Sequence, residues 1–337
     1  MRKKFKLFEC CIPVKGASRS TLCDVQRGKI KFIPNLLCEI LSKYDGQEKE
    51  AAIAFYGPDY EQIIHEYYDF LVENEFGFWT DHPEWFPKMD LTWESPSAIT
   101  NGIIDVNKNS DHNFRKIFGD YEQVHCKHLQ LRFFDAVEIE FLSNNLKYLE
   151  KSVVSSVELI LKFTEETTRE KLKELGKEHP RIHRILVHSS PEFSEALKIS
   201  RESPVEVVYF VQVIDSSAHC GNISMEYFTI EQDTLLESLS FNSCLNKKIS
   251  IDVNGDIKNC PSMTKSYGNI KNQTLKSVLE LPDFRHLWNI NKDQIETCKV
   301  CEFRYICTDC RAFLESDNSL AKPKKCSYNP YTMKWDD

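Results

Sequence analysis

The chain has 337 residues, 41% of them hydrophobic, and its 43 basic and 51 acidic side chains give a formal net charge of −8 at pH 7. This length is enough for two or three hydrophobic cores, and an acidic chain without a basic, aromatic-rich run is a poor partner for nucleic acid. No stretch approaches the roughly 20 apolar residues of a membrane span. The signal-like N-terminus is interrupted by Lys6 and Glu9. We therefore expect a cytoplasmic protein with no nucleic-acid or membrane partner.

The first region, residues 1–89, begins with strand patterns and continues with helical ones. Turn signals at Lys15-Gly16 and Arg27-Gly28 punctuate the strand-like runs. The expected strands are Phe5–Val14 and Ser20–Phe32, and the expected helices are Leu36–Leu41, Gln47–Phe55 and Tyr60–Glu73. This order predicts a small winged-helix-like module. Its aromatic residues are interpreted as module core rather than as a peptide groove: Tyr67, Tyr68, Phe70, Phe76, Phe78 and Trp79.

The second region, residues 97–240, alternates strands with helices. The expected strands are Ala98–Val106, Leu129–Phe134, Val157–Phe163, Ile185–His188 and Val205–Val213. The expected helices are Asn113–Glu122, Val137–Leu149, Arg169–Glu178 and Glu192–Ser200. Strands separated by helices of 10–15 residues predict a parallel sheet with crossover helices. Five such units are too few for an eightfold barrel, so a partial barrel or an open sheet is expected.

The chain contains 13 cysteines, and their positions divide them into two sets. Clustered cysteines in a cytoplasmic protein favour metal ligation over disulfides. Six are scattered among apolar residues and are interpreted as small buried hydrophobes: Cys10, Cys11, Cys23, Cys38, Cys126 and Cys220. The other seven lie in the third region, residues 241–337: Cys244, Cys260, Cys298, Cys301, Cys307, Cys310 and Cys326.

The spacing of the seven cysteines indicates soft-metal chemistry. Two C-x2-C pairs, Cys298–Cys301 and Cys307–Cys310, each let two sulfurs of one turn reach the same site. The segment Ile249–Ile257, with Asn-Gly near its end, predicts a hairpin that returns Cys260 towards Cys244. Seven thiolates fit two zinc sites poorly, because two all-thiolate sites need eight. Spacing favours iron–sulfur clusters and leaves structural zinc open.

The arrangement resembles the SPASM domain, the auxiliary-cluster domain of many radical S-adenosylmethionine peptide maturases. It matches that pattern except that two residues, not three, separate Cys307 from Cys310. The resemblance implies two [4Fe–4S] clusters. One would use Cys244, Cys260 and Cys310 and lack a fourth cysteine, and the other would use Cys298, Cys301, Cys307 and Cys326.

The C-x3-C-x2-C motif of radical enzymes is missing from this chain. The loop Asp105–His112 after the first strand of the middle region contains no cysteine. The stretch Phe133–Glu138 stands where family members carry a Gly-Gly-Glu motif. The middle region therefore resembles a degenerate radical barrel, and S-adenosylmethionine is not expected as a cofactor.

These features together resemble the grasp-with-spasm type of peptide maturase. The resemblance implies an α/β protein with a winged-helix-like module, a degenerate partial barrel and a SPASM domain. It also implies a precursor peptide and an ATP-grasp ligase as partners. The peptide is expected to add as a strand to Phe5–Val14, an edge strand blunted by Lys3, Lys4, Lys6 and Pro13 and flanked by helix Tyr60–Glu73.

Two alternatives and some weaker candidates stay open. The chain could be a non-radical enzyme that works at an open iron of the Cys244 site, or its metal domain could be purely structural. No catalytic residue is assigned.

Asp111 and His112 are interpreted as solvated loop residues rather than a catalytic pair. The carboxylates Asp135, Glu138 and Glu140 either line the mouth of the sheet or belong to a strand–helix junction.

Overall fold

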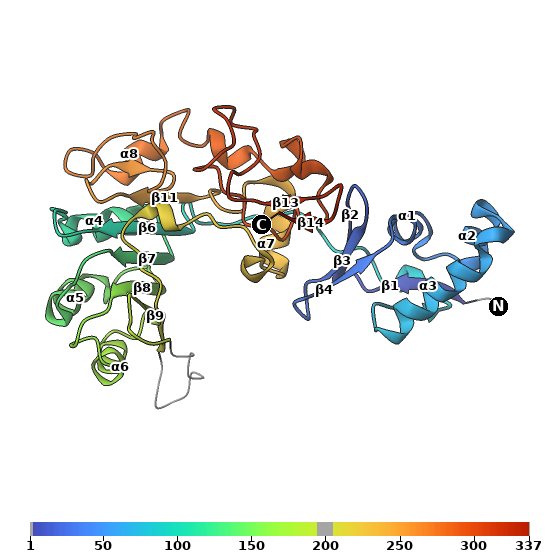
Figure 1. Ribbon diagram of the computed structural model, residues 1–337, viewed down its shortest axis with the longest axis horizontal. Coiled ribbons are helices and arrows are strands. Elements are labelled where there is room, and N and C mark those ends of the chain that lie inside the picture. Colours follow the sequence, from blue (N-terminus) through green and yellow to red (C-terminus); the bar gives the residue numbers. More distant parts are fainter. Residues whose placement is uncertain (1–2, 194–204, 337) are drawn as a thin grey trace.

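The computed structural model describes residues 3–193 and 205–336. The molecule is elongated (Figure 1), with the first strands and helices at one end, the large sheet at the other, and the C-terminal segment between and above them. Within these ranges, no helix is both long and apolar enough to cross a membrane.

The large sheet has seven strands in the order β10-β9-β8-β7-β6-β11-β12. All neighbours pair in parallel except β11 and β12. Its strands are β6 (Asn101–Val106), β7 (His128–Phe133), β8 (Ser156–Lys162), β9 (Ile182–His188), β10 (Glu206–Tyr209), β11 (Lys248–Ile251) and β12 (Ile257–Lys258). The α/β class with an open parallel sheet is thus confirmed.

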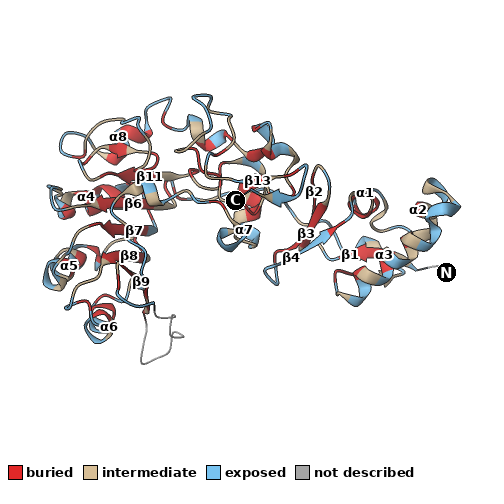
Figure 2. Ribbon diagram, viewed as in Figure 1, coloured by how far each residue is buried: buried red, intermediate tan, exposed pale blue. Residues whose placement is uncertain are grey.

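Crossover helices cover one face of this sheet (Figure 2), where buried residues gather. They are α4 (Phe114–Gln123), α5 (Ile139–Leu146) and α6 (Arg169–Glu178). Asn113 and Thr168 cap α4 and α6, each accepting a hydrogen bond from the main chain at the third helical residue. The helix expected at Glu192–Ser200 falls largely outside the described residues.

The predicted hairpin after Cys244 is confirmed. It adds two strands to the large sheet, so the sheet continues past residue 240, the expected end of the second region. Strand β11 pairs antiparallel with β12 through Ser250 and Lys258, and the turn between them holds Gly255 at φ 85°. The other side of β11 pairs in parallel with β6, so that Lys248 lies opposite Asn101. Two short helices, α7 (Gln232–Ser240) and α8 (Leu275–Leu279), flank this part, and β13 (Tyr328–Asn329) and β14 (Lys334–Trp335) close the chain.

The N-terminal elements form two small sheets and three helices. The helices are α1 (Asn35–Tyr44), α2 (Lys49–Tyr56) and α3 (Glu61–Glu73). The strands are β1 (Lys4–Leu7), β2 (Cys11–Lys15), β3 (Ser20–Asp24), β4 (Lys29–Ile33) and β5 (Gly77–Thr80). Strand β1 pairs with β5, and the other three form the sheet β2-β3-β4. The aromatic residues Tyr68 and Phe76 belong to the buried core of these elements, as predicted.

The prediction of one continuous edge strand at Phe5–Val14 was wrong. The chain turns at Phe8–Cys10 and divides the run between two sheets. The far side of β1 is also occupied: Phe5 N donates to Gln47 O at 2.9 Å, and Phe5 O accepts from Gly46 N at 2.7 Å. Lys6 does not blunt an edge, because it is buried against Glu9 and Asp45. The two carboxylates, which are themselves only partly buried, stabilise the charge of the lysine there.

Strands β2 and β4 are the two edges of the sheet β2-β3-β4, and neither pairs on its outer side with another described strand. Val25 N donates to Cys10 O at 3.0 Å, so Cys10 and Val25 are a hydrogen-bonded pair at the end of the β2-β3 ladder. Along antiparallel strands such pairs alternate with pairs that share no hydrogen bond. By that alternation the main-chain groups of Ile30 and Phe32 point away from β3. On β2 the corresponding outward positions include Pro13, which has no N–H donor.

The sheet β2-β3-β4 packs on both faces. One face contributes Leu22 and Ile33 to the core under the N-terminal helices. The opposite face contributes Val14, Cys23 and Val25 to a second core, which is completed by C-terminal residues: Leu235, Phe303, Ile306 and Tyr328. The N-terminal elements therefore share a core with the cysteine-rich segment.

Candidate metal centre

The structure gathers Cys244, Cys260 and Cys310 in one place. Cys244 sits just before β11 and Cys260 just after β12, so the hairpin brings them side by side. Burial raises the pKa of the Cys244 thiol to about 12; Lys248 opposes this shift, while Cys260, Cys220 and Cys310 add to it. We call these three cysteines the first thiol group. Cys220, which sequence reasoning assigned to the scattered set, lies close enough to interact with them.

A second thiol group comprises Cys298, Cys301, Cys307 and Cys326. The segment around Cys298 is a single helical turn, and Cys301 N donates to Cys298 O at 2.9 Å. Burial raises the pKa of the Cys307 thiol to about 12; Lys292 opposes it, and Asp309, Cys326 and Cys298 add to it. Burial also raises the pKa of the Cys301 thiol, and the neighbouring thiols of Cys307 and Cys298 add to this shift. The seven predicted cysteines thus lie in two groups.

Each thiol group has a lysine beside it. Lys248 Nζ donates to Cys244 Sγ at 3.7 Å, and Lys292 Nζ donates to Cys307 Sγ at 3.4 Å. Burial opposes the charge of Lys292, which is 3% exposed, but Asp309 and the thiols Cys307 and Cys298 outweigh burial and raise its pKa. Buried thiols must lose protons to bind a metal. A fixed ammonium favours the thiolate form that soft metals require.

The polar face of the large sheet holds an ion pair near the first thiol group. Arg132 of β7 donates two hydrogen bonds to Asp105 of β6, Nε to Oδ1 at 2.6 Å and Nη2 to Oδ2 at 2.8 Å. Both side chains are buried. The planar bidentate contact satisfies both oxygens of the carboxylate. This pair lies at the carboxyl ends of β6 and β7, where the loop that follows β6 begins.

The weaker candidates do not come together in one site. Asp111 pairs with Lys271 at 2.7 Å, whereas His112 Nε2 lies 2.9 Å from Asp105 O. Asp135 and Glu138 line a hollow at the ends of β6 and β7. Glu140 lines two neighbouring hollows, one of which it shares with Glu138. Asp135 Oδ2 accepts a hydrogen bond from the main-chain N–H of Lys108 at 2.9 Å, which is a loop-fixing contact.

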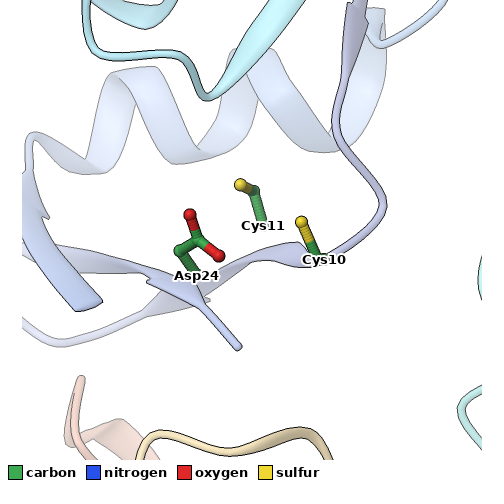
Figure 3. A group of neighbouring side chains, drawn as sticks. All are labelled: Cys10, Cys11 and Asp24. Atoms are coloured by element: carbon green, nitrogen blue, oxygen red, sulfur yellow. The ribbon is translucent and has the colours of Figure 1, made fainter. Parts of the chain in front are cut away.

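A separate group lies in the N-terminal sheet (Figure 3), where ligand atoms of Cys10, Cys11 and Asp24 fall within 4.8 Å of one another. Asp24 is fully buried, but its Oδ1 accepts hydrogen bonds from the main chain of Gln26 and Arg27, and its Oδ2 pairs with the Arg27 guanidinium. A carboxylate with these donors is a poor metal ligand. The interpretation of Cys10 and Cys11 as packing residues therefore stands.

An ion pair joins the N-terminal sheet to the second thiol group. Arg19 Nε donates to Glu302 Oε1 at 2.7 Å, and the Tyr328 hydroxyl donates to the same oxygen at 2.5 Å. Glu302 directly follows Cys301 and is 1% exposed. Thr21 Oγ1 donates to Glu302 O at 2.8 Å. The position of the cysteine loop is therefore tied to strand β3.

Replacing Arg19 by Leu should destabilise the protein by about 3 kcal/mol, because it leaves the buried carboxylate of Glu302 without its cation. Thermal unfolding of the whole chain measures this effect. The Tyr328→Phe variant removes only a hydrogen bond to the same oxygen and should cost about 1 kcal/mol. Equal losses in the two variants would mean that the ion pair adds nothing beyond a hydrogen bond.

Comparison with known proteins supplies a family for the cysteine-rich segment. Residues 243–302, which include Cys244, Cys260, Cys298 and Cys301, match the SPASM family model, described as an iron–sulfur cluster-binding domain. A comparison with curated proteins gives no match. Among solved structures, the chain is similar to Streptococcus suis SuiB in the crystal structure bound to precursor peptide SuiA. The identity is 10% and the TM-score 0.31, over 95% of this chain and 98% of that chain. Residues 243–302 of this protein therefore match the iron–sulfur cluster-binding domain of the SPASM family.

Proposed function

We propose that the chain is a cytoplasmic peptide-maturation protein that holds a ribosomally made precursor peptide together with an ATP-grasp ligase. The observation that carries this proposal is the shared core of sheet β2-β3-β4 and the second thiol group. A peptide bound to this sheet would lie close to iron–sulfur chemistry. The proposed parts are a peptide-recognition module (residues 1–89), a degenerate barrel (97–240) and an auxiliary-cluster domain (241–337).

We assign one [4Fe–4S] cluster to each of the two thiol groups. The proposed ligands of one are Cys244, Cys260 and Cys310, and those of the other are Cys298, Cys301, Cys307 and Cys326. Soft thiolates are the ligands that hold a cubane cluster, and a bound cluster supplies one-electron transfer. The role of Lys248 and Lys292 is to balance the negative charge of the thiolates.

The open edge of β4 suits an added peptide strand. Ile30 and Phe32 offer unpaired main-chain groups there, and main-chain hydrogen bonds supply much of the affinity of such a complex. Lys29 and Lys31 are exposed beside them. An acidic segment of the precursor therefore fits this edge best. Strand β4 takes the place of the Phe5–Val14 run, because the outer side of β1 is occupied and the outer side of β2 carries Pro13, which has no N–H donor.

The ligase partnership is tested by co-purification. We expect an ATP-grasp ligase to be encoded beside this chain, and the two proteins should elute together when the precursor peptide is present. If the chain presents the peptide to the ligase, the complex of the two proteins should form only when the peptide is present. Separate elution of the two proteins at micromolar concentrations, with and without peptide, would contradict the proposed partnership.

The chain should not cleave S-adenosylmethionine reductively. The proposed barrel has the Asp105–Arg132 pair at the end of its first two strands, and the following loop offers oxygen and nitrogen ligands that hold low-valent iron weakly. Incubation with a strong reductant and S-adenosylmethionine should give no 5′-deoxyadenosine above the level of a cysteine-depleted control, Cys244→Ala/Cys301→Ala. Catalytic formation of that product would contradict the degenerate-barrel assignment.

A further inference from the structure

The segment after β10 links the polar face of the large sheet to the SPASM domain. We call residues 210–228 the strap. Near its start, Ile214 N donates to His188 Nδ1, 3.3 Å away at the end of β9. Further along, Ser262 Oγ, which follows Cys260 closely, donates to Ser217 O at 2.8 Å. Figure 1 shows this yellow-green to yellow chain passing from β9 towards β11. Hydrogen bonds at Ile214 and Ser217 therefore hold the first half of the strap in place.

The same contacts fix the main chain at Cys220. Lys325, the residue before Cys326, donates through Nζ to Cys220 O at 2.7 Å and also to Ala218 O. His219 Nε2 lies 2.9 Å from Asp215 Oδ1 within the strap. The main chain around Cys220 is therefore held by Ser262, which lies shortly after Cys260, and by Lys325, which lies just before Cys326.

Gly221 brings the strap against the first thiol group. It adopts φ +85°, and a Cβ on it would lie only 2.7 Å from Cys310 Sγ. An L-residue would be strained there and would also collide with that sulfur. The approach of this backbone to Cys310 places the preceding residue, Cys220, at the rim of the first thiol group.

The thiol of Cys220 lies within electrostatic range of other members of that group. Cys244 and Cys260 both interact electrostatically with Cys220, as do the cations of Lys248 and Arg132. Cys260 and Cys310 are buried and Cys244 is half-buried, whereas Cys220 is exposed. Together with the close approach of Gly221 to Cys310, this places Cys220 beside the first thiol group, as its most exposed neighbour.

We propose that Cys220 is the fourth thiolate ligand of the cluster held by Cys244, Cys260 and Cys310. This inference rests on the proposed assignment of a [4Fe–4S] cluster to the first thiol group. Ligation forms one iron–sulfur bond, and the thiol proton is released to solvent. All four irons then have a protein thiolate. Such a cluster has no open iron for Lewis-acid chemistry, which excludes the alternative of an enzyme that works at an open iron of the Cys244 site.

The test compares cluster stability in the full chain with and without this thiol. Anaerobically prepared wild-type protein should hold about eight irons and keep them on mild oxidation with ferricyanide. The Cys220→Ala variant should lose about one iron under the same treatment, because an iron without a protein thiolate is the least protected corner of a cubane. Iron analysis and the electron paramagnetic resonance signal of a three-iron cluster report the loss.

Two matched variants complete the experiment. Cys126→Ser removes a buried thiol of the helix-covered core and should behave as wild type, while Cys220→Ser should keep all irons but shift the spectrum of one reduced cluster. If Cys220→Ala and wild type keep their iron equally and have identical spectra, the assignment of Cys220 is wrong, although the clusters stand. If the wild type lacks iron and sulfide altogether, the proposed function fails and this inference fails with it.

Discussion

Protein purified without oxygen should be brown and should carry about eight irons and eight sulfides per chain, and the Cys301→Ala variant should retain about half of each. The reason is that the two thiol groups are separate, so each cubane depends on its own cysteines. Cys301 belongs to the group that also contains Cys298 and Cys307. Metal and sulfide analysis, with spectra of the reduced protein, measures the loss.

The matched change in the other group is Cys260→Ala, which should remove the other half and leave the Cys301 cluster intact. The control Cys126→Ser should lose nothing. Colourless protein with stoichiometric zinc and no sulfide would contradict the cluster assignment. Loss of all iron in both single variants would mean that the two groups do not assemble independently.

The precursor peptide should bind the full chain with micromolar affinity, about −8 kcal/mol, and the Ile30→Pro variant should weaken binding at least about tenfold. Proline at this position removes an N–H that points outward from β4 and leaves the pairing with β3 in place. Fluorescence anisotropy with a labelled precursor gives both affinities.

The control for this experiment is Ile30→Val, which retains the N–H and most of the apolar contact with the second core. It should bind as wild type. Thermal unfolding of Ile30→Pro must show a folded chain, so that the loss can be assigned to the edge. Equal binding by the proline variant and the wild type would move the peptide site away from β4, towards the hollow at the ends of β6 and β7.

Local patterns in the sequence were sufficient for most elements of the fold. Helix α6 has the predicted bounds Arg169–Glu178, and the Asn-Gly signal located the hairpin between β11 and β12. These features depend on neighbours in the chain: a capping threonine, a helical apolar period, a turn glycine. The run Phe5–Val14 failed because a reversal at Phe8–Cys10 carries no glycine or proline to mark it.

Two further missed features depend on contacts between distant segments. Nothing in Lys248–Ile251 indicates that it joins β6, because a buried parallel strand and a hairpin strand have the same apolar pattern. Cys220 lies far from any C-x2-C pair, so spacing assigned it to the scattered set. A signal was present in the adjacent Gly221, a residue type that often marks a close backbone approach.

The insertion of β11 beside β6 has a consequence for synthesis and folding. Strand β6 pairs on its other side with β7 early in the chain, but its partner β11 comes roughly 150 residues later, which makes this contact slow to form. Until then one side of β6 is an unpaired edge that another chain can occupy. Nascent or C-terminally truncated chains should therefore aggregate through this strand, and assembly of the SPASM domain completes the protection of the sheet.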